Sequence, residues 1–162
     1  MKLHVVFSLA GAEYALPFDS VLQMETYTGA TLVPGAPAFV DGIVTVRGLV
    51  VPVLDLRTRF GLPRIELNLD ARIIVSQCAG RVVALRVDSA REVLKLDVDK
   101  HQPAPSIVSE RSSGFVHAVH PLGNRLLLLI DLPKLLGENS HDLQPSHLLE
   151  ADGSAALLQL PS

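Results

Sequence analysis

The sequence predicts a mainly β protein built from two repeated small barrels. Apolar and polar residues alternate with a period of two in several short runs, glycines mark turns between the runs, and the order of runs and turns occurs twice. Period two is typical of half-buried strands, and short strands with closely spaced turns favour barrels over a parallel α/β sheet. Hydrophobic residues make up 48% of the 162 residues and charged residues 19%, so a folded chain with a sizeable core is expected.

The first half of the chain opens with a predicted hairpin. Alternating apolar residues run from Leu3 to Leu9 and from Tyr14 to Phe18, and Gly11 lies where the chain has to turn. A nearly continuous apolar run, Leu49 to Leu54, predicts a central strand that is covered on both faces. Prolines make the segment between these regions, Thr26–Asp41, a connector with little regular structure.

The second half contains the same signals in the same order. Gly80 marks a hairpin turn, Leu126 to Ile130 forms an apolar run, and the proline-bearing segment Asp97–Ser113 is predicted as a loop. Each half closes with a short predicted helix, because Asp55 and Asp131 stand in N-cap positions and a glycine follows each helical stretch.

The two halves match residue by residue. Ala10-Gly11 corresponds to Ala79-Gly80, Asp19-Ser20 to Asp88-Ser89, Gly42-Ile43-Val44 to Gly114-Phe115-Val116, and Val53–Leu56 to Leu129–Leu132. The offset grows from 69 to 76 residues, as expected if loops of the second copy lengthened. We therefore predict one domain over residues 1–138, with halves of about 1–66 and 67–138, followed by a tail over 139–162. The tail is predicted as helical in short turns or as flexible.

Composition excludes several classes of function. The net charge of −3, the 4% of aromatic residues and the absence of Trp argue against a nucleic-acid surface. Cys78 is the only cysteine, so no internal disulfide forms and a reducing, cytoplasmic compartment is expected. The apolar runs are too short for membrane insertion, and the run after Lys2 is too short for a signal peptide.

Carboxylates suggest one enzymatic hypothesis. Asp55 and Asp131 hold equivalent places after equivalent strands, as the paired carboxylates of a duplicated hydrolase would. The residues after each Asp are bulky, however, and helix capping explains both positions without chemistry. Asp19 and Asp88 each end a strand before Ser, which favours a structural turn role.

No metal or cofactor is expected from the remaining polar residues. His117 and His120 would point to opposite faces of a strand, and His4, His101, His141 and His147 stand alone in the sequence. Cys78 has no motif partner and is predicted as a small buried side chain. The glycines form no phosphate-binding or dinucleotide motif.

A protein-binding surface is the remaining hypothesis. In Ile43-Val44-Thr45-Val46-Arg47-Gly48, alternation places Ile43, Thr45 and Arg47 on one strand face. Arg is enriched at protein interfaces, although an Arg that simply reaches solvent at a strand end is an equally good interpretation of the residues alone.

Several of these stretches resemble the CheW-like family of chemotaxis coupling proteins. The resemblance rests on Phe7–Leu16, Val33–Gly42, Val44–Arg57, Val87–Val93 and Leu127–Leu132, and it spans residues 5–137 in order. It implies two interlocked five-stranded SH3-like barrels without an active site. It also implies an adaptor role: one surface binds the regulatory domain of a CheA-like histidine kinase, and another binds the cytoplasmic tip of a methyl-accepting chemoreceptor, in receptor arrays at the membrane.

The same resemblance assigns site residues. Arg47 and Gly48 correspond to the receptor contact, while Phe18, Val21 and Gly42 fall where family members are sensitive in partner binding. Thr45 departs from the family's usual Asn, which puts the bracing of Arg47 in doubt. Two alternatives remain: a coupling protein of a non-flagellar pathway such as pilus motility, and a duplicated-barrel hydrolase that uses Asp55 and Asp131.

Overall fold

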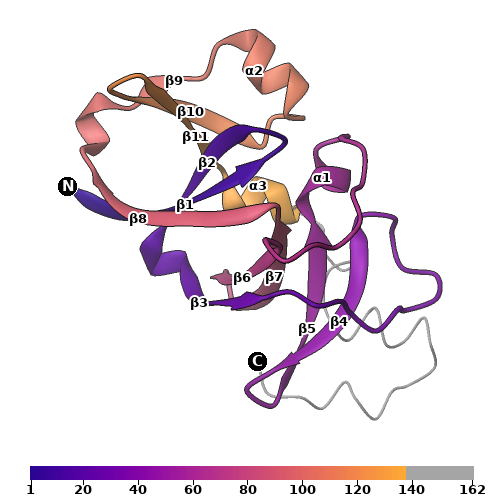
Figure 1. Cartoon of the computed structure of the whole chain (residues 1–162). Helices are drawn as coiled ribbons and strands as arrows, with labels where there is room; N and C mark the ends of the chain where they lie inside the picture. Colours follow the sequence, from indigo (N-terminus) through magenta and orange to yellow (C-terminus); the bar gives the residue numbers. More distant parts are fainter. Residues whose placement is uncertain (138–162) are drawn as a thin grey trace.

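A computed structural model describes residues 1–137 and confirms the mainly β class. Two sheets lie one above the other in Figure 1. The upper sheet, A, has the order β8-β1-β2-β11-β10-β9. Its strands are β1 (Lys2–Leu9), β2 (Ala12–Pro17), β8 (Ser89–Leu96), β9 (Gln102–Pro103), β10 (Val116–Leu122) and β11 (Arg125–Ile130). The lower sheet, B, has the order β3-β6-β7-β5-β4 and contains β3 (Val21–Thr26), β4 (Val40–Val46), β5 (Leu49–Asp55), β6 (Arg72–Cys78) and β7 (Arg81–Val87).

The two halves of the sequence exchange strands. β1 and β2 from the first half pair with β8 and β11 of the second, whereas β3 and β5 pair with β6 and β7. Neither sheet is therefore made by one half of the chain. The boundary predicted near residue 66 therefore does not divide the two sheets.

Both sheets curl toward closure by the same device. Beyond the end of β3, Thr31 exchanges two backbone hydrogen bonds of 2.9 Å with Ile43 of β4. Beyond the end of β8, β9 pairs with β10 in the same way, through Ala118 and Val119. In sheet B the segment that follows β3 thus reaches β4, and in sheet A the segment that follows β8 reaches β10. These contacts bring the two edges of each sheet together.

The structure corrects one part of the repeat. Asp55 N–H donates to the Phe39 carbonyl, and Asp131 N–H donates to the Phe115 carbonyl, each at 2.8 Å. Phe39 is therefore the counterpart of Phe115, and Gly42 the counterpart of Ala118 at the same bulge. The alignment of Gly42 with Gly114 was wrong by four residues, because Gly42 lies within β4 whereas Gly114 lies in the segment before β10.

Three apolar clusters explain why several strands are buried on both of their faces. The largest lies between the sheets and joins Phe7 and Leu16 of sheet A to Leu54 and Leu85 of sheet B. A second cluster around Val53 fills sheet B, and a third around Leu127 fills sheet A. Strands that face one of these clusters on each side have continuous apolar runs, as predicted for β5.

The two closing helices are also confirmed. α1 (Leu56–Arg59) begins after Asp55, whose carboxylate accepts a hydrogen bond from the Arg57 N–H, and α3 (Leu132–Leu136) begins after Asp131, which accepts from the Lys134 N–H. Short 3-10 turns η1 (Phe18–Ser20) and η2 (Val98–Lys100) follow β2 and β8. Helix α2 (Ser106–Arg111) was missed, because prolines before Ser106 indicated a loop. No helix within residues 1–137 is long and apolar enough to span a membrane.

Candidate protein-binding surfaces

Arg47 and Gly48 form the tip of the β4–β5 hairpin, at the lower end of Figure 1. Both have a positive φ, 50° and 80°, as a two-residue hairpin turn of type I′ requires. Arg47 is exposed, and no hydrogen bond or ion pair holds its guanidinium among the described residues. The turn presents a charged side chain beyond the end of sheet B.

The strand-face assignment of Arg47 was wrong. The residue lies in the turn, so it does not share a β4 face with Ile43 and Thr45. An arginine in the left-handed region costs about 1 kcal/mol, which is why the sequence did not indicate this position. Thr45 is exposed on β4 opposite Val50, next to the turn.

Gly42 is buried in the bulge of β4, at the point where sheet B closes. Its φ is 147°, and a Cβ at this position would lie 2.3 Å from the Thr31 carbonyl oxygen. The glycine therefore permits the Thr31–Ile43 bridge. A direct contact of Gly42 with a partner stays a prediction, and barrel closure is the role that its surroundings support.

Phe18 and Val21 lie around η1, where the chain passes from sheet A to sheet B. The Phe18 side chain is 44% exposed and Val21 is half-buried. Leu22 and Met24 of β3 are exposed as well. β3 and β5 run in the same direction within sheet B, so Val21 and the Arg47 turn lie at the same end of that sheet.

The carboxylates considered for hydrolysis have structural partners. Asp55 accepts hydrogen bonds from the Arg57 N–H and from the Thr58 hydroxyl, and it forms an ion pair of 3.2 Å with Arg64. Asp131 accepts from the Lys134 N–H. Each carboxylate thus caps its own helix, as the alternative interpretation predicted, and neither position supports the hydrolase hypothesis.

Asp88 forms a clasp between the two halves. Its carboxylate accepts two hydrogen bonds from Arg57 of α1, at 2.8 and 2.7 Å, and one of 2.8 Å from the Ala10 N–H in the first hairpin turn. Burial would raise the pKa of Asp88, but these donors outweigh burial and hold that pKa below its usual value. The structural role predicted for Asp88 is confirmed.

The clasp gives a measurable coupling between α1 and the second half. In a double-mutant cycle of Arg57→Ala and Asp88→Ala, we expect a coupling of about 1–2 kcal/mol in the free energy of unfolding, because the pair is bidentate and largely buried. Urea denaturation of the four proteins measures it. Asp19→Ala, at the equivalent position of the first half, is the control and should change stability by less than about 0.5 kcal/mol. A coupling near zero would contradict the clasp.

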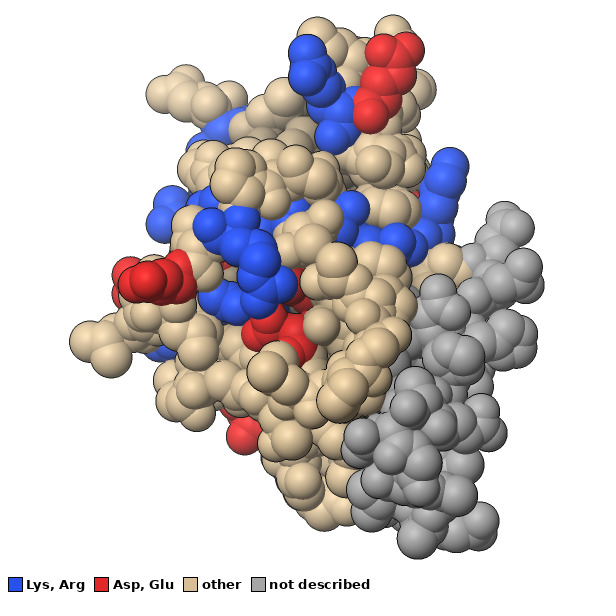
Figure 2. All heavy atoms as spheres, turned by 90° about the vertical axis from the view of Figure 1, so that its right-hand side faces the viewer, with Lys and Arg blue, Asp and Glu red and all other residues tan. Residues whose placement is uncertain are grey.

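Further charges gather on the side of the molecule that carries α1 and β4, where Lys and Arg surround a few acidic side chains (Figure 2). Asp41 binds Arg64, Arg86 and the Tyr27 hydroxyl. Burial would raise the pKa of Asp41, but these donors hold it below its usual value, while burial and Asp41 raise the pKa of Tyr27. Arg64 and Arg86 therefore neutralise a largely buried carboxylate on this side.

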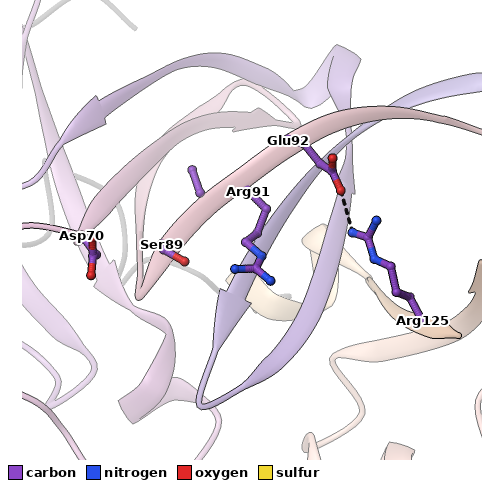
Figure 3. Close-up of a pocket in the computed structure, with 6 residues that line it drawn as sticks. Asp70, Ser89, Arg91, Glu92 and Arg125 are labelled. Atoms are coloured by element: carbon purple, nitrogen blue, oxygen red, sulfur yellow. Dashed lines mark hydrogen bonds and ion pairs between the residues drawn. The ribbon is translucent and has the colours of Figure 1, made fainter.

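A polar hollow of about 600 Å³ is lined by Arg91 and Glu92 of β8, by Arg125 of β11 and by Asp70, which precedes β6 (Figure 3). Arg125 donates to Glu13 at 2.9 and 2.7 Å and to Glu92 at 2.6 Å. The hydrogen bonds from Arg125 hold the pKa of Glu13 below its usual value. The cation of Arg125 is matched within the hollow, so this network links three strands of sheet A.

Three histidines meet at one end of sheet A, contrary to the interpretation that His4 and His101 stand alone. The Nδ1 atoms of His101 and His120 are 2.8 Å apart, and the rings of His4 and His101 meet edge to face at 5.7 Å. His117 is exposed on the opposite face of β10, as predicted. Within residues 1–137 no group of three His, Cys, Asp or Glu is placed to hold a metal ion. His141 and His147 lie outside the described residues.

This histidine cluster predicts acid sensitivity. Burial lowers the pKa of His4, and burial together with His120 lowers that of His101, both from 6.5. The unfolded chain therefore binds more protons than the folded chain below pH 6.5. The contribution of these histidines to the free energy of unfolding is complete above that pH, and it is lost as the pH falls toward the lowered pKa values of the folded state. We expect a loss on the order of 1 kcal/mol between pH 7.5 and 5.5, measured by denaturation at each pH.

A matched pair of variants separates the cluster from other titrating groups. His101→Asn should reduce the loss, because it removes one imidazole from the cluster. His117→Asn removes an exposed imidazole and should leave the loss unchanged. Equal behaviour of the two variants would rule out the cluster as its source.

Cys78 ends β6 and is half-buried, so its side chain is more accessible than predicted. It borders a groove formed where the two halves meet, together with Pro17, Ser20 and Pro133. Sequence reasoning identified none of these residues as part of a site.

The chain is similar to proteins of one known family. The family model described as CheW-like domain matches residues 3–140. The chain is 30% identical over 132 residues to Chemotaxis protein CheW of Klebsiella aerogenes, covering 82% of this chain and 80% of that protein. It is 32% identical over 136 residues to Chemotaxis protein CheW of Bacillus subtilis, covering 84% and 87% of the two chains.

The fold has a solved counterpart as well. The crystal structure of the scaffolding protein TtCheW from Thermoanaerobacter tengcongensis is similar with a TM-score of 0.77 and 32% sequence identity. The similarity covers 86% of this chain and 90% of the other. It therefore includes both sheets and the strand exchange between them.

Proposed function

This chain belongs to the CheW-like domain family, and from that membership we infer that it is a scaffold protein of bacterial chemotaxis. The match over residues 3–140 carries the inference, because it includes both repeated halves. The capping roles of Asp55 and Asp131 agree with a protein that acts by binding.

We propose that the chain couples a chemoreceptor to a CheA-type histidine kinase. In this proposal the Arg47-Gly48 turn contacts the cytoplasmic tip of the receptor. Two features support it: the guanidinium projects from a rigid two-residue turn, and it has no partner among residues 1–137. An arginine carried on a two-residue turn suits a protein contact, because binding orders only its side-chain rotamers and not the backbone of the turn.

Phe18 and Val21 are proposed as additional partner contacts. They lie at the end of sheet B that carries the Arg47 turn, and Phe18 is a large apolar side chain that is 44% exposed. The association with membrane receptor arrays follows from these contacts in the proposal, since a scaffold is held where its receptor is.

Reconstitution tests the function. The purified chain is mixed with a receptor cytoplasmic fragment and with the kinase regulatory domain from the same organism, and complexes are separated by size-exclusion chromatography. We expect each fragment to bind the chain. The receptor fragment and the kinase domain should elute together only when the chain is added to the mixture. Failure of both fragments to bind would overturn the proposal. Co-purification from native lysate then names the pathway, flagellar or other.

A further inference from the structure

Residues 62–65 form a strap that follows α1 and is held against one side of the first half. Arg64 in the strap pairs with two carboxylates, and two arginines donate to the strap's backbone carbonyls at Pro63 and Ile65, over 3.2 and 2.9 Å. The four side chains that anchor the strap are Asp41, Asp55, Arg57 and Arg86. The strap is therefore fixed by polar contacts directly after the helix ends.

The four anchors have counterparts in the second half, and all four counterparts line one groove of about 400 Å³. The bulges of β4 and β10, the N-caps of α1 and α3, and the registers of the β1–β2 and β6–β7 pairs establish this correspondence. In the order used above, the counterparts are His117, Asp131, Pro133 and Pro17. The groove of the second half thus lies where the strap lies in the first half.

The first half is the more deeply buried of the two at this place. Asp55 is 3% exposed and Leu9 is fully buried. Their counterparts in the groove, Asp131 and Cys78, are only half-buried. Within residues 1–137 the second half is therefore open at a site that the first half covers.

We propose that residues 138–141 of this chain form a second strap, which lies in the groove as residues 62–65 lie against the first half. These residues begin directly after Gly137, the counterpart of Gly61, and the two glycines have similar positive φ values, 88° and 77°. Arg81 lies opposite Cys78 in the β6–β7 pair and donates to the Gly137 carbonyl at 3.3 Å. The chain therefore leaves α3 beside the groove.

The second strap lacks the charged anchors of the first. Ser140 stands at the position of Arg64, and prolines replace both anchoring arginines. The rest of the lining is mainly apolar, and its polar groups include His117 and Asp131. Because charge-assisted hydrogen bonds are about twice as strong as neutral ones, the second strap is the more easily released. It acts as a cover that any ligand of the groove has to displace.

Nuclear Overhauser effects in the full chain test this contact directly. We expect cross-peaks from Ser140 and His141 to His117 and Cys78, and none from residues 150–162 to the groove. A complete lack of cross-peaks between residues 138–141 and the groove would overturn the proposal.

A second measurement uses Cys78, the only cysteine of the chain, as a reporter. Combining His117→Asp with Ser140→Arg rebuilds the ion pair that holds the first strap. Alkylation of the Cys78 thiol should be about fivefold slower in this double variant than the two single variants together predict, because the new pair keeps the strap closed. Ser146→Arg with His117→Asp is the matched control, with the same charges farther along the tail, and should show no such coupling.

The outcomes of the second measurement are equally decisive. Additive effects of the two changes on alkylation, or the same coupling with Ser146→Arg, would show that residue 140 does not lie beside His117 and would overturn the strap. His117 is exposed, so the variants should fold normally, and thermal denaturation checks this. Both measurements use the chain alone, so their failure would leave the proposed function untouched.

Discussion

Gly42→Ala will lower the free energy of unfolding by about 3 kcal/mol, the largest stability effect that we expect from one added methyl group in this protein. Two costs combine. The new Cβ would lie 2.3 Å from the Thr31 carbonyl oxygen and 3.0 Å from the Ala30 Cβ, and the backbone φ of 147° is one that an alanine rarely adopts. Urea denaturation followed by circular dichroism measures the loss.

Gly11→Ala provides the matched control. Gly11 also has a positive φ, 83°, but nothing lies within 4 Å of the Cβ that alanine would add. It should therefore lose only about 1 kcal/mol, the conformational part of the cost. A similarly small loss for Gly42→Ala would show that β4 relaxes to the backbone of its counterpart Ala118, which has no positive φ. Partner sensitivity at Gly42 would then need a direct contact to explain it.

Arg47→Glu should abolish receptor binding and leave the fold intact. Reversal of charge at the centre of an interface costs a few kcal/mol, so we expect affinity for the receptor fragment to fall by about a hundredfold or more. Stability should change little, because the side chain is exposed and has no partner among the described residues. Titration calorimetry and thermal denaturation measure the two quantities.

Arg72→Glu is a charge-matched control for Arg47→Glu. Arg72 begins β6, and within residues 1–137 its side chain donates only to the neighbouring backbone carbonyls of Leu69 and Ala71. This variant should retain receptor binding within about threefold, apart from the long-range effect of charge. If both variants weaken binding equally, attraction by net charge would explain the result and the Arg47 turn would not be the contact.

Period-two patterns and cap residues predicted the strands and the two closing helices because these features depend on neighbours in the sequence. Tyr14 and Leu16 alternate with small or polar residues, and Asp55 caps the helix that it precedes. The duplication was visible for the same reason. The correct offset of the repeat in β4 was not visible. Phe39 and Phe115 correspond through their backbone hydrogen bonds and not through the residues that surround them in the sequence.

The candidate sites depended on distant residues and were less predictable. The burial of Gly42 arises from Thr31, the histidine cluster joins His4 to His101 and His120, and the groove requires Pro17 and Pro133 to meet. None of these encounters leaves a local pattern. Arg47 was identified through family resemblance, while its place in the turn required the structure.

The exchange of strands between the halves has a consequence for any attempt to take the molecule apart. A fragment cut near residue 66 would keep β1 and β2 without β8 and β11, and β3 and β5 without β6 and β7. Each fragment would expose unpaired strand edges, so the two should regain structure only by complementing one another when mixed. A single ancestral half would have met the same requirement by intertwining with a second copy of itself.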